Sequence, residues 1–286
     1  MSIERGQLRR RLLTAAVGIP VVIVCSLLGG LAFLLAINLV IGFGLYEFYL
    51  MMEAKGIRPR KAVGVAAGLV VSWYVYFQGG VFSGLFITVV LFGVMVMELL
   101  RVDGELAVFH ISTTIFGVFY VAWLGSHIIL LRQLGEGASA GDLGGSFVIL
   151  AFSLAWATDT GAFFFGSLFG RRKLIPRVSP DKSLEGAIGG FGAAIAAALV
   201  AKAWFAPYLS LVDVAVLGLA SPVVAIVGDL VESLMKRDVK IKDTSRALPG
   251  HGGMLDRFDS VLFVAPLIYY YLRFVVVESG RIATGG

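Results

Sequence analysis

Apolar residues follow one another along most of this chain in runs of about twenty, separated by short segments rich in charged residues, glycine or proline. A helix of that length can cross the hydrocarbon core of a bilayer, because it rises about 1.5 Å per residue. The pattern predicts an all-α polytopic membrane protein, a bundle of about nine transmembrane helices. The predicted spans are 12–28, 31–52, 62–78, 82–100, 112–131, 146–169, 186–206, 211–235 and 258–277.

The composition agrees with a membrane protein. Apolar residues make up 58% of the 286 positions and charged residues 15%, whereas soluble proteins carry about 25% charged residues. Glycine pairs spaced to let helices approach closely in lipid occur at Gly64/Gly68, Gly166/Gly170 and Gly186/Gly190. We interpret these pairs as packing within the bundle, with a homodimer face as the alternative.

Lys and Arg residues are concentrated in alternate connections between the apolar runs. If the N-terminus faces the cytoplasm, the inner segments hold 20 of the 24 basic residues. Cytoplasmic loops carry such an excess. We therefore predict a cytoplasmic N-terminus and a multi-pass protein of the cell inner (plasma) membrane. The net charge of +5 would attract anionic membrane lipids, and it gives no reason to expect a nucleic-acid partner.

The candidate chemistry lies in the second half of the chain. Residues 1–145 are predicted to form N-terminal membrane scaffold helices, and residues 146–286 the catalytic helices and cytoplasmic loops of one integral membrane unit. Asp229, Glu232 and Ser233 share one helical face because they stand at i, i+3 and i+4. Asp256 and Asp259 lie in the first turn of the next helix, where acids also offset the helix dipole.

Acids at membrane depth are costly unless they are paired or bind a cation, so they are functional by default. A capping role does not explain three carboxylates that arrive at one edge from two helices. Carboxylates beside a phosphate substrate suit Mg²⁺. We predict that Asp229, Asp256 and Asp259 converge on one Mg²⁺ site, with Asp229 and Asp256 as direct ligands.

The connection between these two helices is strongly basic. Its cations are Lys236, Arg237, Lys240, Lys242, Arg246 and Arg257. Alone, such a run is typical of a solvated face or a topological anchor. The neighbouring His251-Gly252-Gly253 favours phosphate binding, because glycines let backbone N–H groups approach a phosphate closely. His251 is a candidate phosphate donor or acid–base group, with a structural hydrogen bond as the alternative.

A second polar block spans the helix predicted at 146–169 and the basic loop after it. Asp159 lies near mid-membrane and must face the bundle interior, either at the site or as a structural partner of a lysine or another helix. Lys182 belongs to the loop. P-loop, GxSxG, HExxH and GxGxxG motifs are absent from the sequence, so the enzyme classes that depend on them lose support.

These residues resemble the phosphatidate cytidylyltransferase family, also called CDP-diacylglycerol synthases. The family's C-terminal motif is matched at Ser233, Lys236, Arg237, Lys242, Asp243, Ser245, Leu248, Pro249, His251, Gly252, Gly253, Asp256, Arg257 and Asp259. Its upstream block is similar to Trp156, Asp159, Ala162, Phe163, Gly166, Ser179, Pro180, Lys182 and Ser183. Ser183 stands where the family has threonine, and Asp181 receives no role. The resemblance covers residues 150–260.

The resemblance implies the reaction CTP + phosphatidate → CDP-diacylglycerol + pyrophosphate in phospholipid biosynthesis. It implies catalytic roles for Asp229, Asp256, Asp259, Lys236, Arg237 and His251. It implies substrate binding by Ser233, Lys182, Lys242, Arg257, Asp159, Gly252 and Gly253. Mg²⁺ is the expected cofactor, with room for a second cation. CTP, phosphatidate and membrane lipids are the expected partners.

Because phosphatidate keeps its acyl chains in the membrane, we expect a polar cavity bounded by the helices predicted at 146–169, 211–235 and 258–277. Lys182 and the basic connection would line its rim, with Asp159 deeper.

Two other functions remain open. A CTP-dependent polyprenol or phytol kinase would share the bundle and the nucleotide. A cation-coupled transporter would also use intramembrane acids, but transporters usually show repeat symmetry.

Overall fold

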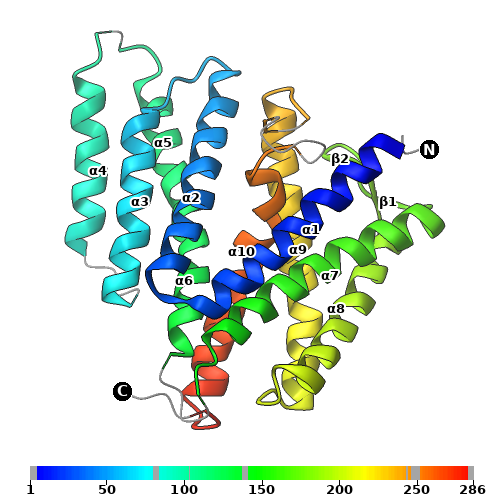
Figure 1. Cartoon of the computed structure of the whole chain (residues 1–286). Helices are drawn as coiled ribbons and strands as arrows, with labels where there is room; N and C mark the ends of the chain where they lie inside the picture. Colours follow the sequence, from blue (N-terminus) through cyan, green and yellow to red (C-terminus); the bar gives the residue numbers. More distant parts are fainter. Residues whose placement is uncertain are drawn as a thin grey trace.

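The computed structural model of the chain describes residues 5–79, 84–102, 104–136, 141–242, 244–245 and 252–282, without the side chains of residues 5–15 and 85–86. Long helices joined by short connections make up almost all of it (Figure 1). In chain order the elements are α1 (Arg5–Leu28), α2 (Gly30–Glu53), α3 (Lys61–Gln78), α4 (Gly84–Leu99), α5 (Ala107–Gly117), the π-helical turn η1 (Val118–Trp123), α6 (Leu124–Leu134), α7 (Gly144–Phe169), β1 (Lys173–Ile175), β2 (Ser179–Ser183), α8 (Leu184–Trp204), α9 (Leu211–Asp238), α10 (Leu255–Tyr271) and η2 (Leu272–Val277).

Each predicted apolar run coincides with a helix. The elements α5, η1 and α6 form one uninterrupted helix, and α10 continues through η2. In the described part of the chain, six helices are long and apolar enough to cross a membrane: Gly30–Glu53, Ala107–Leu134, Gly144–Phe169, Leu184–Trp204, Leu211–Asp238 and Leu255–Val277. The polytopic helical class is therefore confirmed, whereas the count of nine spans and the cytoplasmic N-terminus stay predictions.

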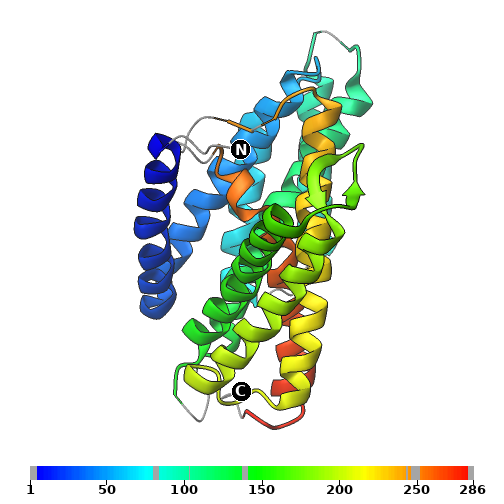
Figure 2. The same ribbon diagram turned by 90° about the vertical axis from the view of Figure 1, so that its right-hand side faces the viewer.

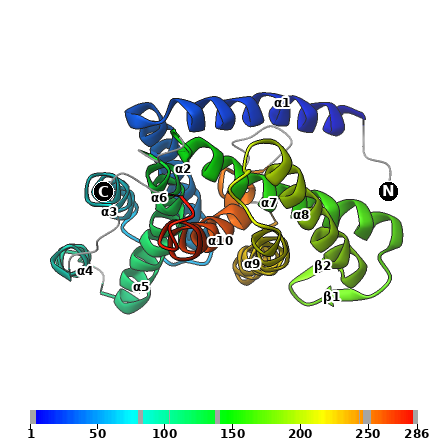
Figure 3. The ribbon, with the colours of Figure 1, turned by 90° about the horizontal axis from the view of Figure 1, so that it is seen from below.

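The helices fall into two groups that share one core. In Figures 1 and 3, α2 to α6 gather on one side and α7 to α9 on the other, while α1 runs obliquely along α7. Helix α10 packs against α6 and α2 as well as α7 and α9, so it lies between the groups. Buried apolar side chains from both groups form a continuous core that includes Tyr49, Val121, Leu217 and Ile268.

Glycines allow α7 and α8 to touch through their backbones. A Cβ on Gly186 would lie 3.1 Å from the Gly166 Cα, and one on Gly190 would lie 3.0 Å from the Thr158 oxygen. These close contacts confirm that the pairs at 166 and at 186/190 serve packing within the bundle. Helices α7 and α8 therefore act as one unit beneath the segment that joins them.

That segment is a short β-hairpin, a local exception in a chain whose other described elements are helices. Strands β1 and β2 pair antiparallel, with Lys173 opposite Ser183 and Ile175 opposite Ser179. Pro176 and Pro180 prevent a helix here, because proline removes a backbone donor and clashes with the preceding turn. The hairpin projects beside the bundle in Figure 2. Ser183 ends it and caps α8 by accepting a hydrogen bond from the Gly186 N–H at 3.1 Å.

The basic connections lie towards one end of the bundle. In Figure 1 the segments 54–60 and 100–102, the hairpin and the start of the α9–α10 connection all lie in the upper part, opposite the C-terminal end of α10. This grouping is what an alternating path through a membrane requires.

Candidate active site

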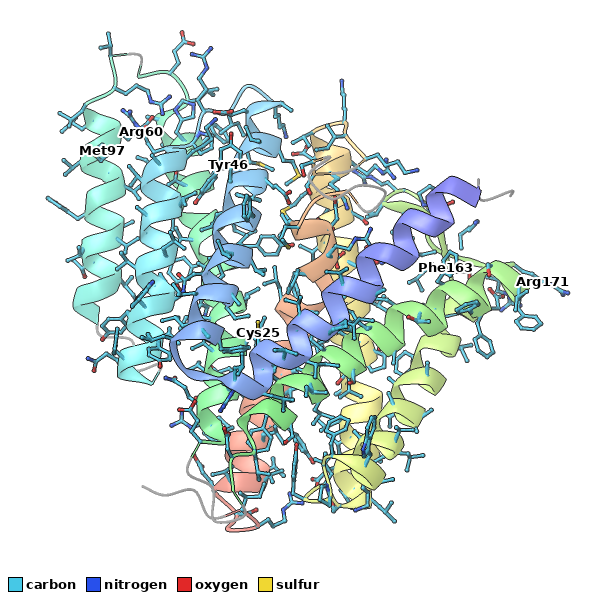
Figure 4. The ribbon with its side chains drawn as sticks, viewed as in Figure 1. Cys25, Tyr46, Arg60, Met97, Phe163 and Arg171 are labelled. Atoms are coloured by element: carbon cyan, nitrogen blue, oxygen red, sulfur yellow. The ribbon has the colours of Figure 1, made fainter. Side chains whose placement is uncertain are left out.

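A cavity of about 570 Å³ lies among α7, the hairpin, α8 and α9. Its polar lining includes Asp159, Ser179, Asp181, Lys182, Asp229 and Lys242. Phe163, Leu174 and Ile226 supply an apolar part, and Figure 4 shows Phe163 on the stretch of α7 that leads to Arg171. A cavity of this size with both kinds of lining suits a ligand with a charged and an apolar part.

The cavity differs in one wall from the sequence prediction. Lys182, Lys242 and Asp159 line it as expected, but α8 and the hairpin form the wall that was assigned to the 258–277 helix. The reason is the contact between α7 and α8, which carries the hairpin over the cavity. The basic residues of the connection are therefore not all at its rim.

Asp229 on α9 lines this cavity and is half-buried. Its Oδ2 lies 2.5 Å from the Lys182 Nζ on the hairpin, and its Oδ1 accepts a hydrogen bond from the Ser233 Oγ at 3.2 Å. The Asp229 side chain is 30% exposed and that of Lys182 is 24% exposed. An incoming anion can therefore compete for Lys182 without a rearrangement of the helices.

Two further acids lie close to Asp229 across the helix contacts. The Asp159 Oδ1 on α7 accepts a hydrogen bond from the Ser260 Oγ on α10 at 3.2 Å, and its charge interacts with those of Asp229 and Asp259. Asp259 is buried and accepts from the Ser260 N–H at 2.6 Å. Gly228 permits this proximity, because a Cβ there would lie 2.8 Å from the Asp259 carbonyl oxygen.

Asp256 belongs to a second, more closed polar group at the start of α10. Its Oδ1 lies 2.8 Å from the Lys236 Nζ, which also lies 2.9 Å from the Glu232 Oε2. Its Oδ2 accepts hydrogen bonds from the Gly253 N–H at 2.7 Å, the Thr244 N–H at 3.1 Å and the Thr244 hydroxyl at 3.0 Å. Both oxygens of Asp256 are thus engaged by the protein.

Between the two groups lie polar atoms that the described residues leave unmatched. Glu232 is fully buried, and its Oε1 has no hydrogen-bond donor among them. Glu232 and Asp259 are both buried, and their carboxyls lie near each other where α9 packs against α10. The Tyr120 hydroxyl from η1 also lacks a hydrogen-bond partner in the described part of the chain. It interacts electrostatically with the carboxyls of Glu232 and Asp259.

The predicted convergence of three carboxylates on one metal is not found. Within the described residues, no three His, Cys, Asp or Glu side chains are grouped closely enough to hold a metal ion. The physical reason is that each acid has its own partner: Asp229 meets Lys182, and Asp256 meets Lys236 and the connection. The donor chemistry still fits Mg²⁺, which needs one or two carboxylates and takes its other oxygens from substrate and water.

The remaining predicted residues are placed as follows. The Arg237 Nε donates to the Val178 oxygen at 3.3 Å, which links α9 to the hairpin turn. Gly252 has a positive φ of 78°, which glycine adopts readily. Arg257 is exposed on the first turn of α10. His251 lies outside the described residues, as do Asp243, Arg246, Leu248 and Pro249.

The sequence reading missed one buried acid beside this site. Glu47 on α2 accepts hydrogen bonds from the Ser245 hydroxyl at 2.5 Å and the Leu255 N–H at 2.9 Å. The sequence pattern predicts only scaffold helices for residues 1–145. A lone acid inside an apolar run was the available signal, since such residues are rarely silent.

Comparison with known proteins gives consistent matches. The cytidylyltransferase family profile matches residues 9–275. A phosphatidate cytidylyltransferase of Synechocystis sp. is 34% identical over 92% of this chain and 96% of its own length. One from Bacillus subtilis is 30% identical over 93% of this chain and 97% of its own. One from Haemophilus influenzae is 42% identical over 46% of this chain and 48% of its own.

Proposed function

This chain belongs to the cytidylyltransferase family, and we propose that it transfers the CMP unit of CTP to phosphatidate, giving CDP-diacylglycerol and pyrophosphate. The family confirms the resemblance drawn from the Ser233–Asp259 motif. The observation that carries the proposal is the cavity in which Lys182, a residue of the upstream matched block, forms an ion pair partly open to solvent with Asp229, four residues before the C-terminal motif begins at Ser233. Phosphatidate and CTP are both polyanions. The cavity lining contains Lys182 and Lys242, and the Lys182 side chain is partly exposed, so an anionic ligand can reach it.

The nucleotide would bind through its phosphates. Lys182 and Lys242 line the cavity, and Arg237 lies at the turn of the hairpin beside it. Phosphate binding by Lys182 would release Asp229 from its ion pair. Mobile lysines suit this exchange, because an ammonium group is a compact charge on a flexible stem.

The lipid would approach from the side of α7. Phe163, Phe164 and Phe165 are exposed on that helix, so acyl chains can stay in the apolar phase while the headgroup enters the cavity. Withdrawal of acyl chains into water would cost about 0.8 kcal/mol per CH₂. We propose that the cavity opens to the cytoplasm for CTP and sideways for the lipid.

The reaction needs no covalent enzyme intermediate. An oxygen of the phosphatidate phosphate attacks the α-phosphorus of CTP, a new P–O bond forms, and the bond from the α-phosphorus to the bridging oxygen breaks. The electron pair of that bond leaves with pyrophosphate. The protein's contribution is to align the two phosphates and to offset their charge, which is the main source of rate in such transfers.

We further propose that Asp229 takes part in holding Mg²⁺, with Asp259 beside it and Asp256 as the third candidate. When bound, Mg²⁺ would offset charge on the transferring group and on pyrophosphate. The support is the oxygen-only donor set and the unmatched Glu232 Oε1 next to Asp259. A second cation stays part of the proposal, with that unmatched oxygen as its candidate ligand.

The position of the label in CTP tests the proposal. Purified protein is incubated with phosphatidate and Mg²⁺, and with CTP labelled in either the α- or the γ-phosphate. Label from the α-position should enter the lipid, and label from the γ-position should appear in pyrophosphate. Lipid labelled from the γ-position would instead indicate a lipid kinase. Unlabelled lipid in both reactions would overturn the proposal.

A further inference from the structure

Glu47 is an ionisable residue in an apolar stretch of α2, six residues before the helix ends at Glu53. Its side chain is buried, and such a residue in an apolar helix is costly unless it has partners. Those partners lie on another element: the Ser245 hydroxyl donates to its Oε1 at 2.5 Å, and the Leu255 N–H donates to its Oε2 at 2.9 Å. These donors are neutral: Ser245 lies within the α9–α10 connection, and Leu255 is the first residue of α10. Tyr46, its neighbour in sequence, marks this level of α2 in Figure 4.

Thr244 joins Glu47 to Asp256. Its hydroxyl donates to the Asp256 Oδ2 at 3.0 Å and lies 3.4 Å from the Glu47 Oε2, while its N–H donates to the Asp256 Oδ2 at 3.1 Å. Gly253 fills the space between, since a Cβ there would lie 2.8 Å from the Glu47 Cδ. Two carboxylates from different halves of the chain therefore hold the same short piece of backbone.

The held backbone leads directly to the cations of the site. Asp256 contacts the Lys236 Nζ at 2.8 Å, on the α9 stretch that also carries Asp229. Lys242, two residues before Thr244, lines the cavity. A shift of the connection on α2 would therefore move Asp256 and Lys242 together, and Lys236 would lose its fixed partner.

We propose that Glu47 is a positioning residue for nucleotidyl transfer. It does not meet substrate; it docks the α9–α10 connection on α2 and so fixes the orientation of Asp256, Lys236 and Lys242. The proposal rests on the transfer reaction proposed above. It differs from a role in helix packing, because the donors that contact Glu47 belong to the connection and to the first residue of α10.

Glu47→Gln tests it with almost no change in shape. An amide keeps one acceptor oxygen and turns the other into a donor, so either the Ser245 hydroxyl or the Leu255 N–H loses its acceptor. We expect kcat to fall about 10–100-fold, as for residues that orient metal or catalytic ligands, while KM for CTP changes less. Amide hydrogen exchange at Thr244, Gly253 and Leu255 should accelerate.

Glu98→Gln is the matched control. Glu98 is another buried carboxylate of the N-terminal half, and it pairs with His110, Arg60 and Arg101. The Glu98→Gln variant should match wild type in kcat per folded molecule and in the amide hydrogen exchange of the α9–α10 connection.

A second pair of variants changes Thr244. Thr244→Val should lose kcat as Glu47→Gln does, and Thr244→Ser should recover most of the turnover.

Wild-type kcat in Glu47→Gln would overturn the proposal. An equal loss in Glu47→Gln and Glu98→Gln would overturn it too, because the effect would then be general destabilisation. The exchange measurement separates this idea from the reaction itself. If wild-type protein transfers no CMP but the Glu47→Gln connection still exchanges faster, the docking stands and the transfer function fails. Unchanged exchange in Glu47→Gln means that docking fails, whatever the reaction.

Discussion

Two carboxylate systems, one in each half of the molecule, differ in how completely their charges are matched. Glu98 on α4 is buried and meets three groups: its Oε1 lies 2.8 Å from the His110 Nδ1 and 2.9 Å from the Arg101 Nε, and its Oε2 lies 3.3 Å from the Arg60 Nε. Asp229 on α9 meets one cation, Lys182, beside a cavity. Under the proposed function, the charge that holds helices together is enclosed by partners, whereas the charge that would serve a ligand has a partner that an anion can replace.

Asp229→Asn tests whether the partly exposed carboxylate serves the reaction, and it should have the largest effect on turnover. The amide carries no charge and is a poorer cation ligand, so we expect turnover to fall at least about 1000-fold, or ~4 kcal/mol in the activation barrier. The folded state should lose little, because Asp229 is partly exposed. Transfer of α-labelled CMP and thermal unfolding in detergent measure the two effects. Full activity in this variant would show that Asp229 has no part in the reaction. The ion pair between Asp229 and Lys182 would then have no catalytic role.

The sequence predicted the helices well, because their ends coincide with the ends of the apolar runs. The run predicted at 31–52 became α2, Gly30–Glu53. The sequence also predicted that Lys182 and Asp159 would line one cavity, and both do. Both belong to the block that runs from one apolar run into the basic loop after it, so their proximity is visible in the sequence.

The sequence could not predict contacts that arise only when distant segments meet. Strands β1 and β2 are too short to show an alternating pattern, and their pairing depends on backbone hydrogen bonds. The separation of Asp229 from Asp256 follows from lysines contributed by different elements, Lys182 and Lys236. The role of Glu47 depends on how α2 approaches the α9–α10 connection. None of these leaves a local pattern.

The second test reverses the first. Glu98→Gln should reduce the free energy of unfolding by about 3 kcal/mol, because it removes the buried counter-charge of Arg60 and Arg101. Turnover per folded molecule should stay within about threefold of wild type. Thermal and denaturant unfolding in detergent measure stability, and the CMP-transfer assay measures turnover on the folded fraction. A loss of turnover with unchanged stability would mean that enclosed charge also serves the reaction, and the contrast would fail.

Variants of Lys182 test the ion pair with Asp229 directly, and we expect the smallest of the three effects from them. Lys182→Ala should lower kcat/KM for CTP about 30-fold, or ~2 kcal/mol, mainly through KM, because the cavity loses one phosphate-binding charge while Lys242 remains. Lys182→Arg should recover part of the loss, since it restores the charge with a different shape. Lys173→Ala is the control: Lys173 is exposed on the same hairpin, opposite Ser183, so kcat/KM should stay within about twofold of wild type. An equal loss of kcat/KM in Lys182→Ala and Lys173→Ala would show that the overall charge of the hairpin causes the effect. The ion pair between Lys182 and Asp229 would then have no specific role.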